Sequence, residues 1–415
     1  MTKPSDNPYR LPPAFADNPG NRRKQQFLED EQFRRLAEST GRPAAMSFFE
    51  ARLREARTLP RARPRIGVLC NLVPVEILMA AGADPVRLDC GNSAAVLAGE
   101  EILSGDVCPL AKATVGQFLS RDSLASTCDA LVVPATCDAK RKLGELLADY
   151  KPVFVLGLPP DKDPNRHAAG VAAELRRLAG FVSSITGRPV GRSALRAAIA
   201  LTNRRSDLLR RLQDIRIAKP RAIAARDLFA CVQASLLSPA PIESWLDAAD
   251  LLLAEAEAFT PERRSLRPRL LLTGAPMVWP NFKVLNLLEE CGADVVADTL
   301  CTGVQSCIDP AVTDETSFDA LLRALAARSV FGAICPCFAS QTARIHRVID
   351  LAEQARAAGV VNYSLRLCQP FDLETYRLER VLKDRRMPVM NLRTDYSLED
   401  TEQLRVRLEA FLETL

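Results

Sequence analysis

Short apolar runs alternate with helical stretches along most of the chain, and this alternation constrains the fold more than any other feature. RIGVLCNLVP, which starts at Arg65, is a β-branched run that ends at a proline. VEILMAAGADPVRLDC then predicts a helix, a glycine turn and a second strand, and DALVVPATCD and PVFVLGLPP add two strands around the helical AKRKLGELLADY. Short buried strands that alternate with helices are typical of parallel sheets with helices on both faces.

The same pattern resumes after Pro268, with predicted strands in RLLLTGAPM, DVVADTLC, GAICPCF, GVVNYSLRLC and PVMNLRTDY. We therefore predict an α/β fold with two doubly wound parallel-sheet domains, Rossmann-like or flavodoxin-like, a helical N-terminal extension and a helical connecting region. The predicted units are the extension (1–64), a first α/β domain with a helical insertion (65–265) and a second α/β domain (266–415). Ser397, with Asp400 three residues later, resembles a capping box and predicts the start of the last helix.

The charge balance gives no general argument for a nucleic acid or a membrane as a partner. The chain has 55 basic and 51 acidic residues among 415, a net charge of +4. It has no apolar run near the roughly 18 residues of a membrane-spanning helix, and residues 1–20 lack the regions of a secretory signal. We therefore expect a cytoplasmic protein whose thiols stay reduced.

Basic residues do gather locally, in the predicted helical region. The spacing favours a solvated helix face, and a docking patch for an acidic partner is the alternative. The members of this basic run are Arg204, Arg205, Arg210, Arg211, Arg216, Lys219 and Arg221.

The chain has 12 cysteines and only 2 histidines. In open parallel sheets, ligands bind beyond the carboxyl ends of the strands. Cys108 precedes Pro109, which suits the first turn of a helix, so this thiol is expected at a helix N-terminus where amides stabilise a thiolate. Six further cysteines lie at or just after the ends of predicted strands: Cys70, Cys137, Cys301, Cys335, Cys337 and Cys368.

A thiol set with almost no histidine selects soft metals, either zinc or iron–sulfur. Structural zinc usually uses C-x2-C pairs, and the chain has none; its closest pair is Cys335-Pro336-Cys337. Scattered ligands therefore indicate an iron–sulfur cluster held between domains. The alternative, a cysteine that is only a small buried hydrophobe, stays open for Cys70 and Cys90. It is favoured for Cys128, Cys231, Cys291 and Cys307.

Several catalytic motifs are absent from the sequence. There is no G-x-x-x-x-G-K-[ST] loop for ATP, no G-x-G-x-x-G fingerprint for a dinucleotide and no H-E-x-x-H zinc motif. Surface or core roles are expected for the two histidines, His167 and His346.

Three segments resemble the cysteine blocks of the 2-hydroxyacyl-CoA dehydratase and benzoyl-CoA reductase superfamily: CPLAKATVG at Cys108, PATCDAKRKLGELL at Cys137 and RLCQPFDLE at Cys368. DTLCTG at Cys301, ICPCF at Cys335 and Cys337, and the ending NLRTDYSLEDTEQLRVRLEAF are similar to the double-cubane-cluster members. Ala275, in LLTGAPM, stands where many relatives have a cysteine.

The resemblance implies a cofactor, an activity and partners. A double-cubane [8Fe-9S] cluster would use Cys108, Cys137 and Cys368 for one cubane and Cys301, Cys335 and Cys337 for the other, with Cys70 as the rival for Cys335 or Cys337. An ATP-hydrolysing iron–sulfur activator would supply low-potential electrons to a homodimer that reduces a small molecule. Lys112, Lys140, Arg141 and Lys142, which follow two of the cysteines, would moderate cluster charge or meet the partner, unless they are solvated.

Two alternatives remain at this point. The chain could be the [4Fe-4S] subunit of a (R)-2-hydroxyacyl-CoA dehydratase or benzoyl-CoA reductase type enzyme, which would need a different partner subunit. It could also be a non-catalytic scaffold stabilised by zinc or by its thiols.

Overall fold

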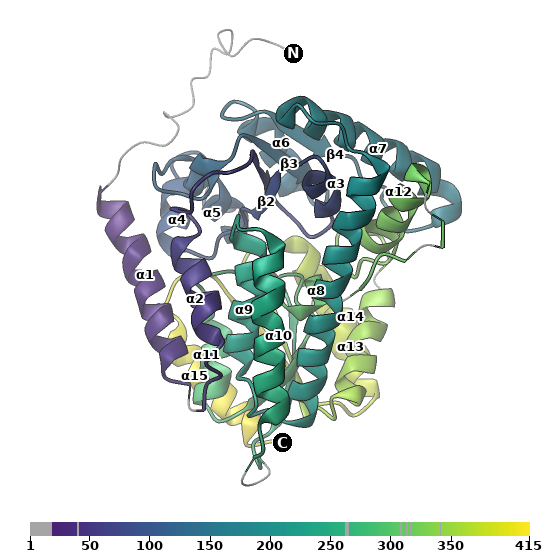
Figure 1. The fold of residues 1–415 in the computed structure, drawn as a ribbon. Coiled ribbons are helices and arrows are strands. Elements are labelled where there is room, and N and C mark those ends of the chain that lie inside the picture. The colour runs from purple at the N-terminus through teal and green to yellow at the C-terminus, as the bar shows by residue number, and fades with distance from the viewer. Residues whose placement is uncertain are drawn as a thin grey trace.

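The computed structural model describes residues 19–39, 41–261, 265–307, 309–312, 314–315, 317–340 and 342–415. Within these residues it contains two four-stranded parallel sheets with helices around them (Figure 1). The prediction of an α/β fold with two doubly wound sheets is therefore confirmed. The predicted domain boundaries stay predictions, and residues 1–18 of the predicted extension lie outside the described residues.

The first sheet has the strand order β2-β1-β3-β4. Pro85 lies in β2, where a proline is tolerated because β2 is an edge strand and one side of it needs no ladder hydrogen bonds. The strands are β1 (Arg65–Val68), β2 (Asp84–Arg87), β3 (Ala130–Pro134) and β4 (Val153–Leu156).

The second sheet has the order β6-β5-β7-β8, which is the first sheet's order repeated. Four of the five predicted strands are present, but the strand predicted in GAICPCF is wrong: a π-helix, η4 (Ala327–Phe331), leads into a loop there. Pro336 between two cysteines removes a backbone donor that a central strand would need. The strands are β5 (Arg269–Gly274), β6 (Asp294–Asp298), β7 (Gly359–Leu365) and β8 (Val389–Thr394).

Helices cover both faces of each sheet. On the first sheet, α3 and α7 pack on one face and α5 and α6 on the other. The N-terminal helices and those of the first half are α1 (Pro19–Ala37), α2 (Met46–Glu55), α3 (Val75–Ala80), α4 (Ser93–Gly99), α5 (Pro109–Phe118), η2 (Ala125–Thr127) and α6 (Asp138–Leu147).

The connecting region is helical, as predicted. Gly187, in the left-handed conformation (φ 69°), ends α7. Helix α9 packs against both edge strands, β2 and β6. The region therefore joins the two sheets. Its helices are α7 (Pro164–Thr186), α8 (Arg192–Ala218), α9 (Ala225–Leu237) and α10 (Ile242–Ala258).

The helices of the second half do not all stay with the second sheet. α12 packs against α7 and the hydrophobic core of the first sheet, whereas α13 and α14 cover one face of the second sheet. The elements are α11 (Lys283–Glu290), η3 (Val304–Ser306), α12 (Phe318–Ala326), η4, α13 (Thr342–Gln354), α14 (Gln369–Asp384) and α15 (Thr401–Leu412).

The capping box predicted at Ser397 is wrong. The last helix, α15, begins at Thr401, and its N-cap residue, Asp400, makes no side-chain cap hydrogen bond. Asp400 instead accepts hydrogen bonds from Lys283 and Thr394 at 2.6 Å each. A tertiary ion pair thus replaces the local cap.

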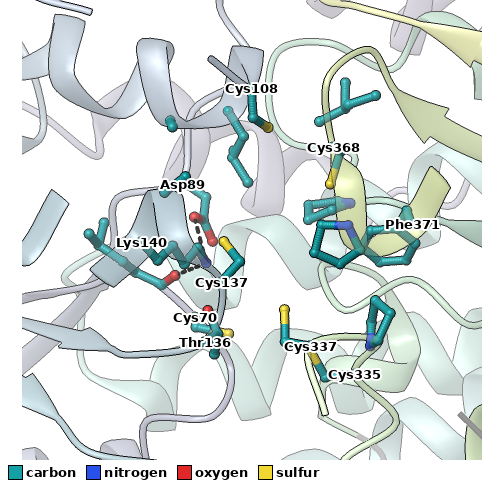
Figure 2. Close-up of a pocket in the computed structure, with 18 of the residues that line it drawn as sticks. Cys70, Asp89, Cys108, Thr136, Cys137, Lys140, Cys335, Cys337, Cys368 and Phe371 are labelled. Carbon is teal, nitrogen blue, oxygen red and sulfur yellow. Dashed lines mark hydrogen bonds and ion pairs between the residues drawn. The ribbon is translucent and has the colours of Figure 1, made fainter. Parts of the chain in front are cut away.

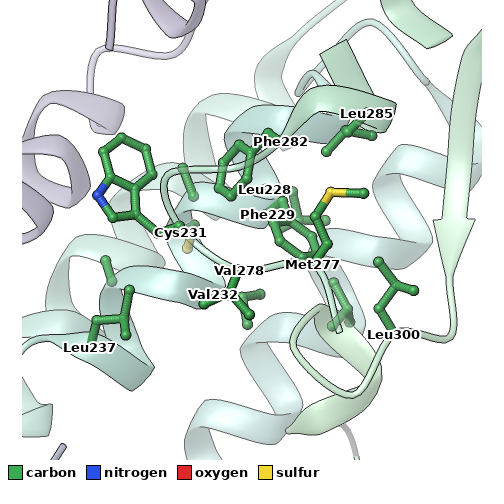
Figure 3. Close-up of a cluster of buried hydrophobic side chains, with 14 of the residues drawn as sticks. Leu228, Phe229, Cys231, Val232, Leu237, Met277, Val278, Phe282, Leu285 and Leu300 are labelled. Atoms are coloured by element: carbon green, nitrogen blue, oxygen red, sulfur yellow. The ribbon is translucent and has the colours of Figure 1, made fainter. Parts of the chain in front are cut away.

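A hydrophobic cluster holds α9 against the second half of the chain (Figure 3). Phe229 on α9 contacts Phe282 edge to face, with ring centroids 5.0 Å apart. Cys231 is fully buried in this cluster. In the part of the chain that the structure describes, no helix is long and apolar enough to cross a membrane.

Candidate functional site

The carboxyl ends of both sheets open into one cavity of about 1050 Å³. Parallel sheets bind ligands at this edge, where neighbouring connections diverge to opposite faces. The structure brings all six predicted ligands together there, and Cys70 with them. The seven lining cysteines are Cys70, Cys108, Cys137, Cys301, Cys335, Cys337 and Cys368. Figure 2 labels all of them except Cys301.

Three of these cysteines occupy the N-cap positions of helices. Cys108 caps α5, Cys137 caps α6 and Cys368 caps α14. We call these three the helix-cap thiols. The first amides of a helix have no intrahelical acceptor and carry partial positive charge, so they stabilise a thiolate beside them.

The local sequence explains why the chain turns at two of these residues. Prolines lie in the first turns of α5 and α14, where their missing amide hydrogen costs nothing. Leu367, just before Cys368, has φ 63° in the left-handed region. This conformation is strained for a leucine, and it makes the sharp turn from β7 into α14.

Cys108 and Cys368 face each other across the cavity (Figure 2). A hydrogen bond from the Cys368 thiol, helped by the backbone amides of Leu110 and Ala111, lowers the pKa of Cys108. The same hydrogen bond, with burial, raises the pKa of Cys368. The two thiols therefore form a unit in which one proton is held preferentially by Cys368.

Cys137, Cys335 and Cys337 form a second unit. Hydrogen bonding from Cys337 lowers the pKa of Cys137 to about 5, and the amide and charge of Lys140 act in the same direction. Cys337 also lowers the pKa of Cys335. Cys337 holds the shared proton, and its own pKa is raised.

The loop that carries Cys335 and Cys337 is attached to the first half of the molecule. Lys162 Nζ donates to the Ala333 carbonyl at 2.5 Å, and the Ala339 amide donates to the Pro160 carbonyl at 2.9 Å. Upstream, Arg328 in η4 pairs with the fully buried Glu76 of α3. These contacts place thiols of the second half beside Cys137 of the first.

Buried cations surround the other wall of the cavity. Arg87, at 3% exposure, binds the carboxylate of Asp89, and Lys140 Nζ lies 3.7 Å from the same carboxylate. Neither terminal nitrogen of Arg87 has a hydrogen-bond partner within the part of the chain that the structure describes. The charges of Arg87 and Lys140 act on Cys70 and Cys301, where burial is the larger effect.

A third cation, Arg344, comes from α13. It pairs with Glu374 and donates to Thr273 Oγ1 at 3.0 Å, and its charge acts on Cys335 and Cys301. We call Cys70, Cys301 and Cys335 the cation-flanked thiols. Burial raises the pKa of Cys301 to about 12, so the free thiol stays protonated at neutral pH.

Comparison with known proteins identifies the family of this chain. The family model described as 2-hydroxyglutaryl-CoA dehydratase, D-component, matches residues 70–415. This chain belongs to that family. The resemblance found in the sequence to the 2-hydroxyacyl-CoA dehydratase and benzoyl-CoA reductase superfamily is therefore confirmed.

Individual relatives agree with this assignment. The chain is 31% identical over 360 residues to the protein YjiM of Escherichia coli (strain K12), whose name proposes a dehydratase subunit; the match covers 86% of this chain and 92% of that protein. It is 24% identical over 250 residues to one of the benzoyl-CoA reductase subunits of Thauera aromatica, covering 59% and 64%. It is 23% identical over 375 residues to the beta subunit of (R)-2-hydroxyglutaryl-CoA dehydratase from Acidaminococcus fermentans, covering 87% and 94%.

The remaining cysteines lie outside the cavity. Cys128, Cys231 and Cys307 are buried in hydrophobic core and Cys291 packs against it, as expected for small hydrophobic residues. Cys90, which the sequence left open, lines a separate cavity of about 60 Å³. Ala275 is buried, and its neighbours Gly274 and Pro276 line the thiol cavity.

The basic residues near the cysteines have different roles. Lys140 and the exposed Lys142 line the cavity, whereas Lys112 is buried and pairs with Glu100 at 2.7 Å. Arg141 is exposed, and both Arg141 and Lys142 pair with acidic residues of their own helix. Sequence reasoning did not identify Arg87, Asp89 or Arg344; the only available signal was the position of Arg87 and Asp89 at the end of a predicted strand.

The thiols do not form a site for one ion. Among the described residues, no group of three or more histidine, cysteine, aspartate or glutamate side chains is arranged to hold a single metal ion. A polynuclear cluster binds each thiolate to a different metal atom, so its ligands need not converge on one point. The donor set of thiols around a wide cavity fits such a group.

Proposed function

We propose that this chain is an iron–sulfur reductase whose thiol cavity binds a double-cubane [8Fe-9S] cluster. The observation that carries the proposal is that six cysteines from five separate segments line one cavity between two sheets. Thiolates select soft metals, and a cavity of about 1050 Å³ has room for a cluster and a small substrate.

The assignment of ligands follows the family resemblance, and the shared helix-cap position of Cys108, Cys137 and Cys368 supports it. The helix-cap thiols Cys108, Cys137 and Cys368 would hold one cubane, and Cys301, Cys335 and Cys337 the other. When bound, such a cluster would supply single electrons at low potential. Cys70 is a competing ligand for Cys335 or Cys337, because it lines the same wall as Cys301.

The protein's own residues would set the charge of the site and exclude water. Arg87 and Arg344, which are buried, and Lys140, whose side chain is 14% exposed, supply three largely desolvated positive charges. Such charges act strongly over short distances. Leu103, Leu146 and Phe371 add an apolar lining. A small unsaturated or nitrogen-containing molecule fits the space that remains.

The electrons would come from a separate protein. The chain has no P-loop motif, so we assign ATP hydrolysis to an iron–sulfur activator that docks transiently. The names of the relatives, which describe subunits of dehydratases and reductases, support a system of several components. We further propose a homodimer.

The second candidate function is a [4Fe-4S] subunit that acts on a CoA thioester. The relatives' names favour it, because two of them name CoA-dependent enzymes. In that case only the helix-cap thiols would bind iron. Together with a different subunit, the chain would act either as a lyase that removes water from a (R)-2-hydroxyacyl-CoA or as a reductase of an aromatic thioester.

Anaerobic purification, followed by iron and sulfide quantification and electron paramagnetic resonance, tests the proposal. We expect about eight irons per chain for the double cubane. About four irons and a co-purifying second subunit would support the CoA-dependent alternative instead. Zinc without iron would contradict both iron–sulfur functions and would support a non-catalytic, zinc-stabilised scaffold.

A further inference from the structure

A second cavity, of about 260 Å³, lies at the opposite edge of the first sheet from the thiols. Asp84, at the start of β2, lines it, and Asp89, just after β2, lines the thiol cavity. Five residues of extended chain separate the two by about 16 Å. The second cavity is therefore a separate site, and it is formed by residues of α2, α3, α8, α9 and α10 around Asp84.

Arg205 of α8 lines this cavity. Its side chain is 9% exposed, and its buried Nε has no hydrogen-bond partner among the described residues. Leaving a charged donor desolvated and unsatisfied is costly, so such groups call for an explanation such as a ligand. The neighbouring Arg204 differs: it is exposed and pairs with Asp250.

Two more arginines line the same cavity. Arg52 lies over the ring of Phe48, with its guanidinium carbon 4.8 Å from the ring centroid, and Arg63 lies in the segment before β1. In the part of the chain that the structure describes, neither arginine forms an ion pair. Three guanidinium groups thus line one cavity with no salt bridge to a described carboxylate, although the charge of Arg63 acts on Asp84.

Helix α10 also begins at this cavity. Its N-cap residue is Pro241, which supplies no side-chain acceptor, and Pro241, Ile242 and Glu243 line the cavity. The first amides of this 17-residue helix are therefore open to a ligand. Helix N-termini with arginines beside them bind anions, phosphate above all.

Two carboxylates oppose this charge, Asp84 and Glu243. Glu243 is exposed, whereas Arg205 is buried, so the cationic group acts in the less screened environment. The three arginines and the helix N-terminus outweigh the two carboxylates. The volume of about 260 Å³ is below the usual range of sites for drug-sized ligands and suits a small anion or phosphomonoester.

We propose that this cavity binds the phosphate group of a small molecule, with Arg205 as the main ligand and Arg52, Arg63 and the first amides of α10 around it. The source is either free phosphate or a small phosphomonoester. The inference does not depend on the proposed iron–sulfur function, because no thiol lines this cavity and it lies beyond the other end of β2.

Calorimetric titration and thermal unfolding of the anaerobically purified full chain test the proposal, with inorganic phosphate and glycerol 3-phosphate as probes and chloride at equal ionic strength as the control. We expect saturable binding and a rise in unfolding temperature that depends on probe concentration. Tighter binding of phosphate points to the free ion, and tighter binding of glycerol 3-phosphate to a phosphomonoester.

Variants locate the site. Arg205→Met should weaken binding about tenfold or more, because it removes a charge-assisted hydrogen bond. Arg204→Met, on the same helix but exposed, is the matched control and should bind as the wild type does. Asp84→Asn should bind a few-fold more tightly, because one opposing charge is lost.

Three outcomes overturn the proposal: no binding of either probe by wild-type protein, equal binding by Arg205→Met and wild type, or weaker binding by Asp84→Asn. The unfolding temperature of unliganded Arg205→Met shows whether that variant is folded. Because these measurements need no cluster, their failure leaves the iron count as a separate test of the reductase function.

Discussion

The two groups of thiols in the cavity are surrounded by different kinds of positive charge. The helix-cap thiols lie beside backbone amides at the starts of α5, α6 and α14, whereas the cation-flanked thiols lie near side-chain cations. Backbone amides remain after almost every amino-acid substitution, but a single substitution can remove a side-chain cation. The fold therefore sets the environment of one group, and the sequence sets that of the other. Lys140 belongs partly to both, because it also acts on Cys137.

The cysteines themselves give the largest expected effect. Serine at Cys108, Cys137 or Cys368 should abolish the visible absorbance of the cubane that this group holds, because serine is a poor ligand for iron. Serine at Cys301 or Cys335 should remove the other cubane, which would show that the groups bind separately. Iron per chain and absorbance of anaerobic protein measure both effects. Cys291→Ser, outside the cavity, is the control, and unchanged absorbance in all helix-cap variants would contradict the assignments.

Arg87→Met should act on the cation-flanked thiols more than on the helix-cap thiols. It removes one buried positive charge, so the reduction potential of the nearby cubane should fall, as a redox titration followed by electron paramagnetic resonance would show. It also leaves Asp89 with Lys140 alone, which should lower the free energy of unfolding by about 3 kcal/mol. Arg366→Met, an exposed arginine of the second half, is the control. An equal shift of both cubanes would contradict the division into two groups.

Glu76 tests the attachment that brings the two groups together. Arg328 and Thr202 hold the pKa of Glu76 at about 2 against an ordinary value of 4.5, despite its burial. Because the folded pKa is depressed, this stabilisation is present above about pH 4.5 and is lost as the pH falls toward 2. The shift corresponds to about 3 kcal/mol.

We expect Glu76→Gln to be less stable than wild type at pH 7 and nearly equal to it near pH 2, as denaturant unfolding at several pH values would show. The control is Glu315→Gln, whose partner Arg323 lies on the exposed surface. A constant difference across the pH range would contradict a charged Glu76 in the folded protein.

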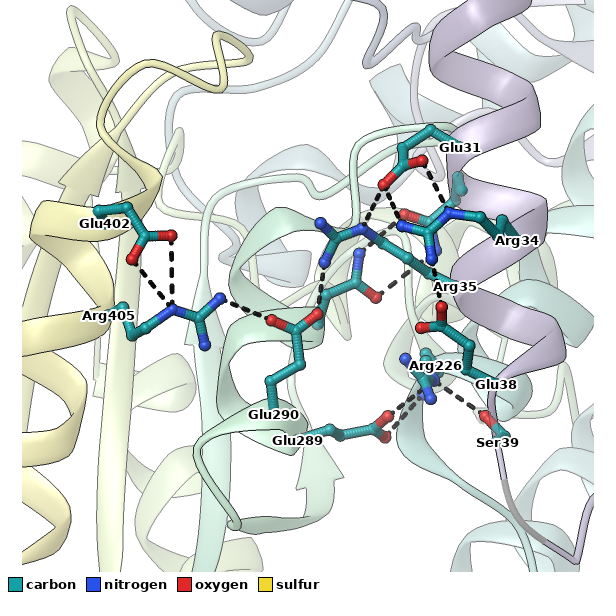
Figure 4. Close-up of polar contacts among 12 residues, drawn as sticks. Glu31, Arg34, Arg35, Glu38, Ser39, Arg226, Glu289, Glu290, Glu402 and Arg405 are labelled. Carbon is teal, nitrogen blue, oxygen red and sulfur yellow. Dashed lines mark hydrogen bonds and ion pairs between the residues drawn. The ribbon is translucent and has the colours of Figure 1, made fainter.

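The smallest effect is expected far from the cavity, where α1 meets the second half (Figure 4). Glu290 binds both Arg35 of α1 and Arg405 of α15, and all three side chains are about a quarter exposed. Glu290→Gln should cost at most about 1 kcal/mol, and the loss should shrink in high salt. Iron content should not change. Altered iron binding in this variant would mean that the two thiol groups depend on the periphery as well.

The sequence predicted what depends on local pattern. Apolar runs located eight strands, and strand ends located Cys70, Cys137, Cys301 and Cys368 at one cavity. Prediction from the sequence failed where tertiary contacts determine the local backbone structure. The segment around Cys335 resembles a strand but is a loop, because it is anchored through Glu76 and Pro160, more than 170 residues away.

The buried cations could not be predicted for the same reason. Nothing near Arg344 in the sequence indicates Cys301, and only folding brings them together. The predicted start of α15 was wrong because Asp400 accepts a hydrogen bond from Lys283 of α11 and does not take part in a capping box with Ser397. The basic run also divides in space: Arg204 pairs at the surface, while Arg205 is buried.

The attachment of the Cys335–Cys337 loop to the first sheet determines how the halves of the molecule can separate. If the crevice widened, this loop would travel with Cys137, and their contact would survive. The contact between Cys108 and Cys368, which come from opposite sheets, would be the one to break. A metal group held by both thiols would therefore restrict the motion of the two halves relative to each other. Its removal should increase that motion before it causes global unfolding.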